Sequence, residues 1–406
     1  MRRDPWILVT GQFVSVIGDG LASVAVLWWV LQTTGSVALM AGVAAILAAA
    51  GLVGSPFAGV LADRLDRRSL MMAADGALAL CYGAIAALSV SGHLPIWALV
   101  VLLAISRMIG AAYFPALLAA LPRLVVPEAL PRVNGLLSFA QSAGGLIGAA
   151  VGGVLVAAFG VALALGADAG SFLVSFAALA LIAIPAERAI AASGFGGQML
   201  EGLRYVRKHP LMRALTGPVL AINALTNGAM VLLPAPAAGP LHAGAQGYGF
   251  LEASFPLGTV FASAAISATG RSARRASSLY GLIALIGLAF GVLGLGRSLV
   301  LGLVMMAVAG AGAAIANAAV NSLLQSGVPE EFQGRVFSLL GSTAQALVPL
   351  SQAGAGALAT VWSVGGVIAA CGGGVLATGL GFGWSGRHPV DEAFADAGLG
   401  PPAASA

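Results

Sequence analysis

Three ionisable side chains stand inside long apolar stretches, and their chemistry suits the movement of charge across a membrane. They are Asp19, Arg107 and Glu252. An ionisable group at membrane depth costs about 2.5 kcal/mol or more unless it is paired or hydrated, so such groups indicate ion pathways or proton relays. A carboxylate that alternates between its ionised and protonated forms can carry a proton.

Asp19 and Arg107 are predicted to lie at similar depth. Asp19 follows Trp6 by 13 residues, which places it roughly 20 Å along a helix. Arg107 follows Pro95 by 12 residues, on a stretch that enters from the other side. We interpret them as a pair that exchanges partners when a proton or substrate binds. The alternative, a permanent ion pair that only fixes packing, stays open at this point.

Glu252 lies in the outer third of its stretch without a cation nearby in sequence. Such a carboxylate either faces a cavity, where it carries a proton or attracts a cationic substrate, or is a hydrated acid near the external mouth. Two further acids fit supporting roles. Asp168 is expected to have a packing and helix-capping role. Asp75 is expected to reach the arginines of the charge cluster at residues 59–68.

Amide side chains recur at helical spacing and need polar partners, because lipid offers none. Asn223 and Asn227 favour a cavity lining. Asn317, which Asn321 and Gln325 follow at four-residue intervals, fits a cavity lining or interhelical bonding equally well. Gln141 and Gln345 are further candidate polar wall residues.

Composition places these residues in an all-α membrane protein. The chain has 406 residues, of which 59% are hydrophobic and 8% charged, against about a quarter charged in soluble domains. Glycine, proline and charged residues interrupt the apolar sequence at intervals that predict twelve transmembrane helices. They cover residues 6–32, 37–62, 69–91, 95–121, 129–158, 161–185, 210–238, 247–269, 276–295, 298–326, 332–361 and 364–384.

Other chemistries find no support in the residue pattern. Cys81 and Cys371 lie in apolar runs, and no His or Cys spacing resembles a metal site. No G-x-x-x-x-G-K-[ST] loop is present to hold ATP phosphates. No span carries a nucleophile with a plausible His base, so an intramembrane enzyme is disfavoured. We therefore predict no metal, no other cofactor, no enzyme activity and no nucleic-acid partner.

Charge asymmetry predicts the orientation. All but two of the 19 lysines and arginines fall on the side of the two termini, the exceptions being Arg297 and Arg107. The positive-inside rule therefore predicts cytoplasmic N- and C-termini in a cytoplasmic membrane. We expect a six-helix bundle over 1–185, a linker over 186–209, a second bundle over 210–384 and a disordered tail over 385–406. Residues 199–208 suit an interfacial helix, or else a solvated basic linker.

The two predicted halves resemble each other. The segment that begins Val126-Pro127-Glu128 recurs as Val328-Pro329-Glu330, about half the chain later and at the start of the equivalent span. Internal repeats of six helices are the architecture of secondary transporters, which handle their substrate near the midplane.

The dense charge cluster at 59–68 fits G-x-L-x-D-R-x-x-R-R and resembles the loop signature of the major facilitator superfamily. Segments 18–20, 31–35, 121–127, 168–172, 201–207 and 248–249 are similar to its subgroup of enterobactin-type and macrolide exporters. The resemblance implies a conformational switch in which an aspartate meets the start of span 11. The residues assigned to it are Gly59, Asp63, Arg64, Arg67, Arg68, Asp75 and Arg335.

The same resemblance implies export by proton antiport and a monomer. The antiporter motif of span 5 is present as Gly144, Gly148, Gly152 and Gly153, with Ala149 where the family has proline. These glycines permit close helix approach, but the bend that a proline would encourage is not specified. We expect an exporter of a small molecule, such as a drug, a macrolide-like compound or a siderophore, in contact with lipid. The alternatives are an importer or uniporter of the same fold, or a transporter-like receptor.

Overall fold

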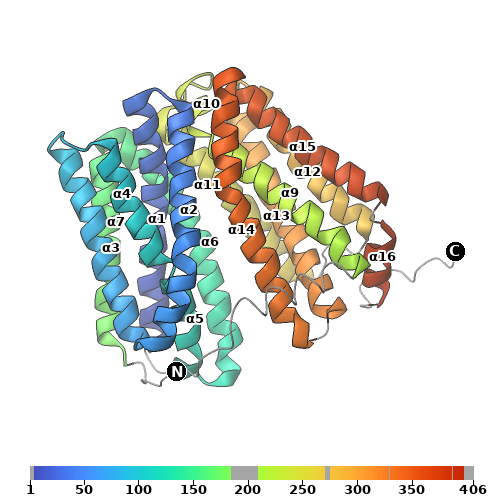
Figure 1. Cartoon of the computed structure of the whole chain (residues 1–406), viewed down its shortest axis with the longest axis horizontal. Helices are drawn as coiled ribbons and strands as arrows, with labels where there is room; N and C mark the ends of the chain where they lie inside the picture. Colours follow the sequence, from blue (N-terminus) through green and yellow to red (C-terminus); the bar gives the residue numbers. More distant parts are fainter. Residues whose placement is uncertain (1–3, 184–208, 270–274, 329, 386, 397–406) are drawn as a thin grey trace. The chain divides into compact units, whose positions relative to one another are not determined.

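Long apolar helices make up nearly all of the protein. The computed structural model describes residues 4–183, 209–269, 275–328, 330–385 and 387–396, and within these ranges the chain forms helices and no strands (Figure 1). The first half contains α1 (Asp4–Thr34), α2 (Val37–Arg64), α3 (Arg67–Val90), α4 (Ile96–Gly110), α5 (Tyr113–Leu124), the short 3₁₀ helix η1 (Pro127–Ala129), α6 (Leu130–Phe159) and α7 (Val161–Leu181).

The second half repeats this helical pattern. It contains α9 (Pro210–Met230), α10 (Pro234–Ala238), α11 (Gly244–Thr269), α12 (Ala276–Leu295), α13 (Leu299–Gly327), α14 (Glu330–Val361), α15 (Val364–Ser385) and α16 (Arg387–Asp396). All twelve predicted spans are therefore helical.

Eleven stretches of the described chain are both long and apolar enough to cross a membrane. The predicted span that is not among them is the eleventh, 332–361, which corresponds to α14; this helix has 32 residues but carries Gln333, Gln345 and Gln352 among its apolar side chains. The predicted fold class, an all-α membrane protein, is confirmed.

Local sequence signals explain several helix ends. The hydroxyl of Ser36 accepts a hydrogen bond from the Leu39 backbone N–H and so caps α2. The carboxylate of Asp66 accepts from the Ser69 backbone N–H in the same way at the start of α3. Gly160 joins α6 to α7 at a φ of 82°, a conformation that favours glycine.

Two predicted spans are divided. The predicted helix 95–121 ends as α4 at Gly110 and restarts as α5 at Tyr113, and the span 210–238 separates into α9 and α10. The expectation of a disordered tail over 385–406 is wrong for its first part, because α16 forms there. Val390 and Phe394 lie one turn apart on α16 and are at most 1% exposed, so burial of this apolar pair stabilises the helix.

The structure divides into two compact units. The first comprises the described residues of Met1–Ala191 together with Leu233–Ala253, and the second comprises those of Ala192–Leu232 and Ser254–Ala406. This corrects the predicted boundary after residue 209, because α10 and the start of α11 pack with the first six spans rather than with the last six. The predicted interfacial helix at 199–208 lies outside the described residues.

Small residues bring the helices of each unit together. In the first unit α1 packs on both α6 and α7, and α3 packs on α7. A Cβ on Gly20 would lie 2.8 Å from the Gly148 Cα, so the backbones of α1 and α6 are in contact. In the second unit α12 and α15 are similarly close at Gly287 and Gly294. Dense helix packing of this kind is driven by van der Waals contact when lipid surrounds the bundle.

Candidate functional site

Asp19 lies in the middle of α1 on a face that the first unit leaves uncovered. Its side chain is exposed, whereas the α1 residues one turn away at Ser15 and Ala22 are buried. The carboxylate of Asp19 interacts electrostatically with the guanidinium of Arg107 on α4, whose side chain is also exposed. The structure thus places the two charges that sequence reasoning paired within electrostatic reach of each other, and charged groups on an open face can accept a solute or a proton.

Asp168 on α7 joins this pair from the interior of the unit. Its side chain is 0% exposed and interacts electrostatically with both Asp19 and Arg107. One carboxylate oxygen accepts a hydrogen bond from the Ser171 hydroxyl at 3.2 Å, while Oδ2 has no hydrogen-bond partner among the described residues. The acid reaches α1 because Gly18 has no side chain, and a Cβ there would clash with Ser171 Oγ and Asp168 Oδ1.

Sequence reasoning gave Asp168 a packing and capping role and so missed its place beside Asp19. The signal was present in the chain, since Asp168 and Ser171 share one face of α7 with Ser175. An acid followed by two hydroxyls on one helical face inside an apolar span indicates a buried polar stripe.

Glu252 anchors the beginning of α11 to α1. Its carboxylate accepts a hydrogen bond from the Ser23 hydroxyl at 3.2 Å and interacts by hydrogen bonding with Tyr248 one turn earlier. The Tyr248 ring stacks on Trp28 of α1, with ring centroids 6.4 Å apart and an angle of 18° between the planes. Glu252 therefore has neutral hydrogen-bonding partners rather than a cation, and its protonation would change those hydrogen bonds.

The span-5 glycines are used for close helix contact on two faces of α6. A Cβ on Gly144, Gly148 or Gly152 would collide with Val16, Ile17 or Leu21 of α1. A Cβ on Gly153 would instead lie 2.8 Å from the Gly249 Cα on α11. Three of the four glycines thus hold α1 and the fourth holds α11, which matches the expectation that they permit close approach.

The charge cluster between α2 and α3 is described only in part. The structure does not describe the surroundings of Gly59 or the side chains of Asp63, Arg64 and Arg335, so the switch between span 2 and span 11 stays a prediction. The described arginines of the cluster bond to backbone carbonyls within the first unit, Arg67 on α5 and Arg68 at the end of α7. Arg67 donates to the carbonyl of Ala119 at 2.6 Å, and Arg68 donates to the carbonyls of Leu179 and Ala180 at 2.9 and 2.8 Å.

Asp75 lies deeper than the arginine cluster that it was expected to join. It is eight residues into α3 and 1% exposed, and its surroundings include Ser175 of α7 and Tyr113 of α5. Ser175 is close enough to be a hydrogen-bonding neighbour of Asp75, but neither carboxylate oxygen has a well-formed hydrogen bond within the described ranges. Arg67 and Arg68 bond to backbone carbonyls of α5 and α7, and Asp75 lies apart from them in the core of the unit.

The candidate cavity amides differ in their surroundings. Asn223 and Asn227 are half-buried on α9, and each donates to a backbone carbonyl one turn earlier, at 2.9 and 2.8 Å. Gln141, Asn317 and Gln345 are exposed on α6, α13 and α14. Their assignment to a cavity wall stays a prediction.

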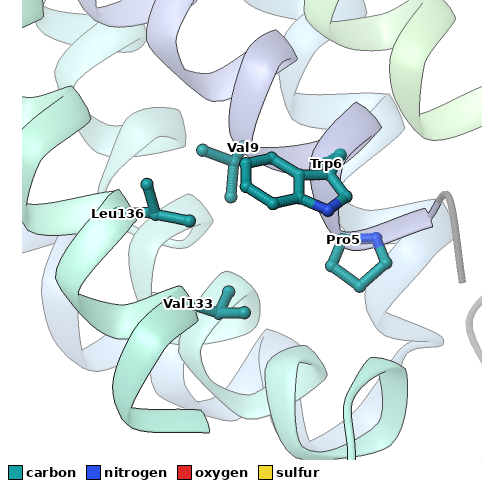
Figure 2. A pocket seen from close by; sticks show the side chains of 5 residues that line it. All are labelled: Pro5, Trp6, Val9, Val133 and Leu136. Atoms are coloured by element: carbon teal, nitrogen blue, oxygen red, sulfur yellow. The ribbon is translucent and has the colours of Figure 1, made fainter. Parts of the chain in front are cut away.

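Figure 2 shows an apolar pocket between the beginnings of α1 and α6. Its lining consists of Pro5, Trp6, Val9, Val133 and Leu136. This lining offers no charged side chain to a proton or a polar solute, so the pocket is not the candidate site. Within the described ranges no group of three His, Cys, Asp or Glu side chains is placed to hold a metal ion.

A helical membrane protein of this length, with an internal repeat and an acid–base cluster inside its spans, is a multi-span transporter of small solutes. The chain belongs to the Major Facilitator Superfamily, whose family model matches residues 8–351.

Relatives and solved structures agree with this assignment. The enterobactin exporter EntS of Shigella boydii serotype 4 (strain Sb227) is 31% identical over 338 residues, covering 81% of this chain and 78% of the relative. EntS of Escherichia coli O139:H28 shows the same identity and coverage. The fold is similar to that of a mutant of the nucleoside transporter NupG, with a TM-score of 0.74 and 13% identity over 93% of this chain and 98% of that one. A bacterial homologue of the iron transporter ferroportin gives a TM-score of 0.71 and 16% identity over 96% and 98%.

Proposed function

We propose that the protein is a secondary active exporter that moves a small molecule out across the cytoplasmic membrane in exchange for protons. The observation that carries the proposal is the placement of Asp19, Arg107 and Asp168 in one electrostatic cluster on three different helices. One cation facing two carboxylates favours a site that holds a variable number of protons, because binding one proton leaves a balanced pair.

The exposure of Asp19 and Arg107 supports a working site rather than a structural ion pair. A pair that only fixes packing gains most when it is buried and fully hydrogen-bonded. Here both side chains are open while their helical neighbours are packed, so a proton or a solute has access to them.

Similarity to enterobactin exporters supports export and suggests the class of cargo. Enterobactin-like siderophores are therefore the first substrates to test, followed by macrolide-like compounds and drugs. The positive-inside charge distribution supports cytoplasmic termini, which would place the beginnings of α1 and α3 on the cytoplasmic side.

The test uses an Escherichia coli strain that lacks its own enterobactin exporter. Expression of the wild-type chain is expected to restore enterobactin in the medium, and Asp19→Asn is expected to abolish this. The matched control is Asp396→Asn, which removes an exposed carboxylate at the end of α16. The same cells are then loaded with a panel of labelled drugs.

Lower accumulation of enterobactin or a panel compound supports export. Higher accumulation than in control cells would show import and overturn the proposed direction. Export that is undiminished in Asp19→Asn under an imposed pH gradient would remove Asp19 as the proton carrier and leave it a packing role. No change with any compound would favour a receptor.

A further inference from the structure

A polar seam runs through the interior of the first unit, behind the open face that carries Asp19. The seam is formed by Gln12 and Ser15 of α1, Asp75 of α3, and Asp168, Ser171 and Ser175 of α7. Each of these side chains is at most 6% exposed, and together they are six of the eight buried polar or charged residues in the described chain. Polar groups this concentrated in an apolar bundle are costly unless they are hydrogen-bonded, paired or hydrated.

Glycines on α1 bring the seam together. Asp168, Ser171 and Ser175 follow one another at three and four residues and so share a face of α7. That face packs on α1 at two glycines: Gly18 lies against Asp168 and Ser171, and a Cβ on Gly11 would be 3.5 Å from the Ser175 Cα. Gln12 and Ser15 lie between these glycines along α1. The polar groups of the two helices therefore occupy one continuous strip.

Several acceptors of the seam have no well-formed hydrogen bond, although Ser175 is a hydrogen-bonding neighbour of Asp75. Four of the five buried side-chain atoms without a partner in the described chain belong to it: Gln12 Oε1, both carboxylate oxygens of Asp75, and Asp168 Oδ2. All four are oxygens that accept. A buried acceptor without a donor costs about 1–3 kcal/mol, and an ionised carboxylate without one costs more. The missing donors are supplied if the carboxyls hold protons and water bridges the remaining gaps.

The two acids at the ends of the seam have different electrostatic surroundings. Asp168 faces Arg107 of α4, Asp19 of α1 and Tyr82 of α3. Asp75 faces Tyr113 of α5, Ser175 of α7 and Asp19 of α1, and no basic side chain of the described residues is among these groups. The Tyr113 hydroxyl lies 3.1 Å from Ser175 Oγ. Burial disfavours the charged form of a carboxyl, so a buried carboxyl without a facing cation favours its neutral, protonated form.

We propose that this seam is a proton relay through the first unit, in which Asp75 is a protonated terminal carboxyl that exchanges its proton with Asp168. The proposal deepens the proposed function and rests on it. Each transfer conserves the proton: a hydroxyl or bound water accepts one proton and releases its own to the next oxygen. Asp168 and Asp75 are thereby left with interchanged protonation states, and no other reactant is consumed.

The position of Asp75 gives the relay a direction. Asp168 and Ser175 are seven residues apart, which corresponds to about 10 Å along α7. Asp75 is eight residues from Arg67 at the start of α3, so it lies roughly 12 Å from that end. With the predicted cytoplasmic termini, the seam extends from mid-depth toward the cytoplasm. It would move a proton toward the cytoplasmic side, as far as Asp75, through the interior of the first unit.

Infrared difference spectroscopy of the purified full-length protein in lipid tests the protonation of Asp75 without any substrate. The wild type is expected to show a protonated carboxyl C=O band at neutral pH that Asp75→Asn removes. Asp75→Glu should keep a carboxyl band at a shifted frequency and serves as the variant that preserves the acid. The control, Asp396→Asn, removes an exposed carboxylate and should leave the band unchanged. A wild-type band that Asp75→Asn leaves in place would overturn the proposal.

Transport in proteoliposomes, with enterobactin as the probe, tests the relay itself. Asp75→Asn should lower efflux driven by a pH gradient by at least about tenfold while enterobactin exchange at equal pH continues, because exchange needs no net proton transfer. Ser175→Ala should slow pH-driven efflux, whereas Ser267→Ala on an exposed face of α11 should not. Equal loss of exchange and efflux would show a structural role and refute the relay. If the wild type moves no enterobactin, the cargo is wrong, and the infrared result still decides the protonation of Asp75.

Discussion

A single methyl group added at Gly153 should force α6 and α11 apart. A Cβ at this position would lie 2.8 Å from both the Ala245 carbonyl oxygen and the Gly249 Cα, about 0.6 Å inside ordinary contact, which begins at 3.4 Å. Both obstacles are backbone atoms, which cannot rotate out of the way. Overpacking of this kind costs about 1–3 kcal/mol.

The overpacking in Gly153→Ala raises the free energy only of the conformation in which α6 and α11 are in contact. Alternating access requires the outer ends of the helices to separate when the solute site opens there, and the α6–α11 contact belongs to the arrangement described above. Destabilising that arrangement by about 1–3 kcal/mol changes a conformational equilibrium by roughly 5- to 150-fold. Gly153→Ala is therefore expected to raise the population in which α11 has left α1 and α6.

Cysteine accessibility measures this shift. Ser23 contacts Glu252 at 3.2 Å and is half-buried, so Ser23→Cys reports separation of α11 from α1. In a background where Cys81 and Cys371 are serine, a membrane-impermeant maleimide should label Ser23→Cys faster when Gly153→Ala is present.

Gly145→Ala is the matched control for this measurement. Gly145 lies on the same helix, and a Cβ there would meet nothing within 4 Å. An added methyl in open space on a helix stabilises it slightly, so labelling should remain at the parental rate. Equal labelling in the two variants would refute the reasoning, because it would show that α6 and α11 do not depend on backbone contact at Gly153.

Three further predictions concern the ends of the helices. Arg68→Ala removes hydrogen bonds to the last carbonyls of α7 and should lower the free energy of unfolding by about 1.5–3 kcal/mol, whereas Arg213→Ala at an exposed position should change the Tm little. Phe394→Ala should destabilise the second unit by about 3–5 kcal/mol, because this side chain is 1% exposed. Thermal unfolding in detergent measures the effect, with Glu392→Gln at an exposed position as the control. An unchanged Tm in Phe394→Ala would contradict the prediction. Asp63→Asn should abolish transport while substrate affinity stays within a few-fold; lost membrane expression instead would reduce the cluster to an orientation signal.

Hydropathy, with the glycines, prolines and charged residues that interrupt the apolar runs, predicted the spans well. A membrane helix must be long and apolar whatever surrounds it. The same signals did not predict the break between α4 and α5. There Ala111 and Ala112 separate the two helices, and Pro115 in the first turn of α5 has no backbone N–H to bond to the Ala111 carbonyl. This proline is a local signal for the break that the prediction did not use. The helix α16 was missed because its mean composition is polar. The four-residue spacing of Val390 and Phe394 was the only signal of its apolar face.

Depth and direction of side chains limited the prediction of the site. Asp19 and Arg107 were predicted at similar depth from their distances to the helix ends, since a helix rises uniformly. They do interact electrostatically, while their role as a pair stays a prediction. Asp75 was linked to the wrong neighbours because sequence proximity to Arg67 and Arg68 says nothing about where those long side chains turn. Asp168 was undervalued because its role depends on Gly18 of a distant helix, and close approach at a glycine becomes visible only in three dimensions.

The membership of Leu233–Ala253 in the first unit has a consequence for hybrid proteins. A chimera made by exchanging halves with a relative at the central linker would separate Gly153 from Gly249 and Ser23 from Glu252, pairs that contact each other here. The α11 surface would then come from one parent and the α1 and α6 surfaces from the other, although each evolved to pack against its own counterpart. Crossover points at the linker, before Leu233 and after Ala253 would take residues 233–253 from the same parent as the first half. The contacts of α11 with α1 and α6 would then be kept in the hybrid.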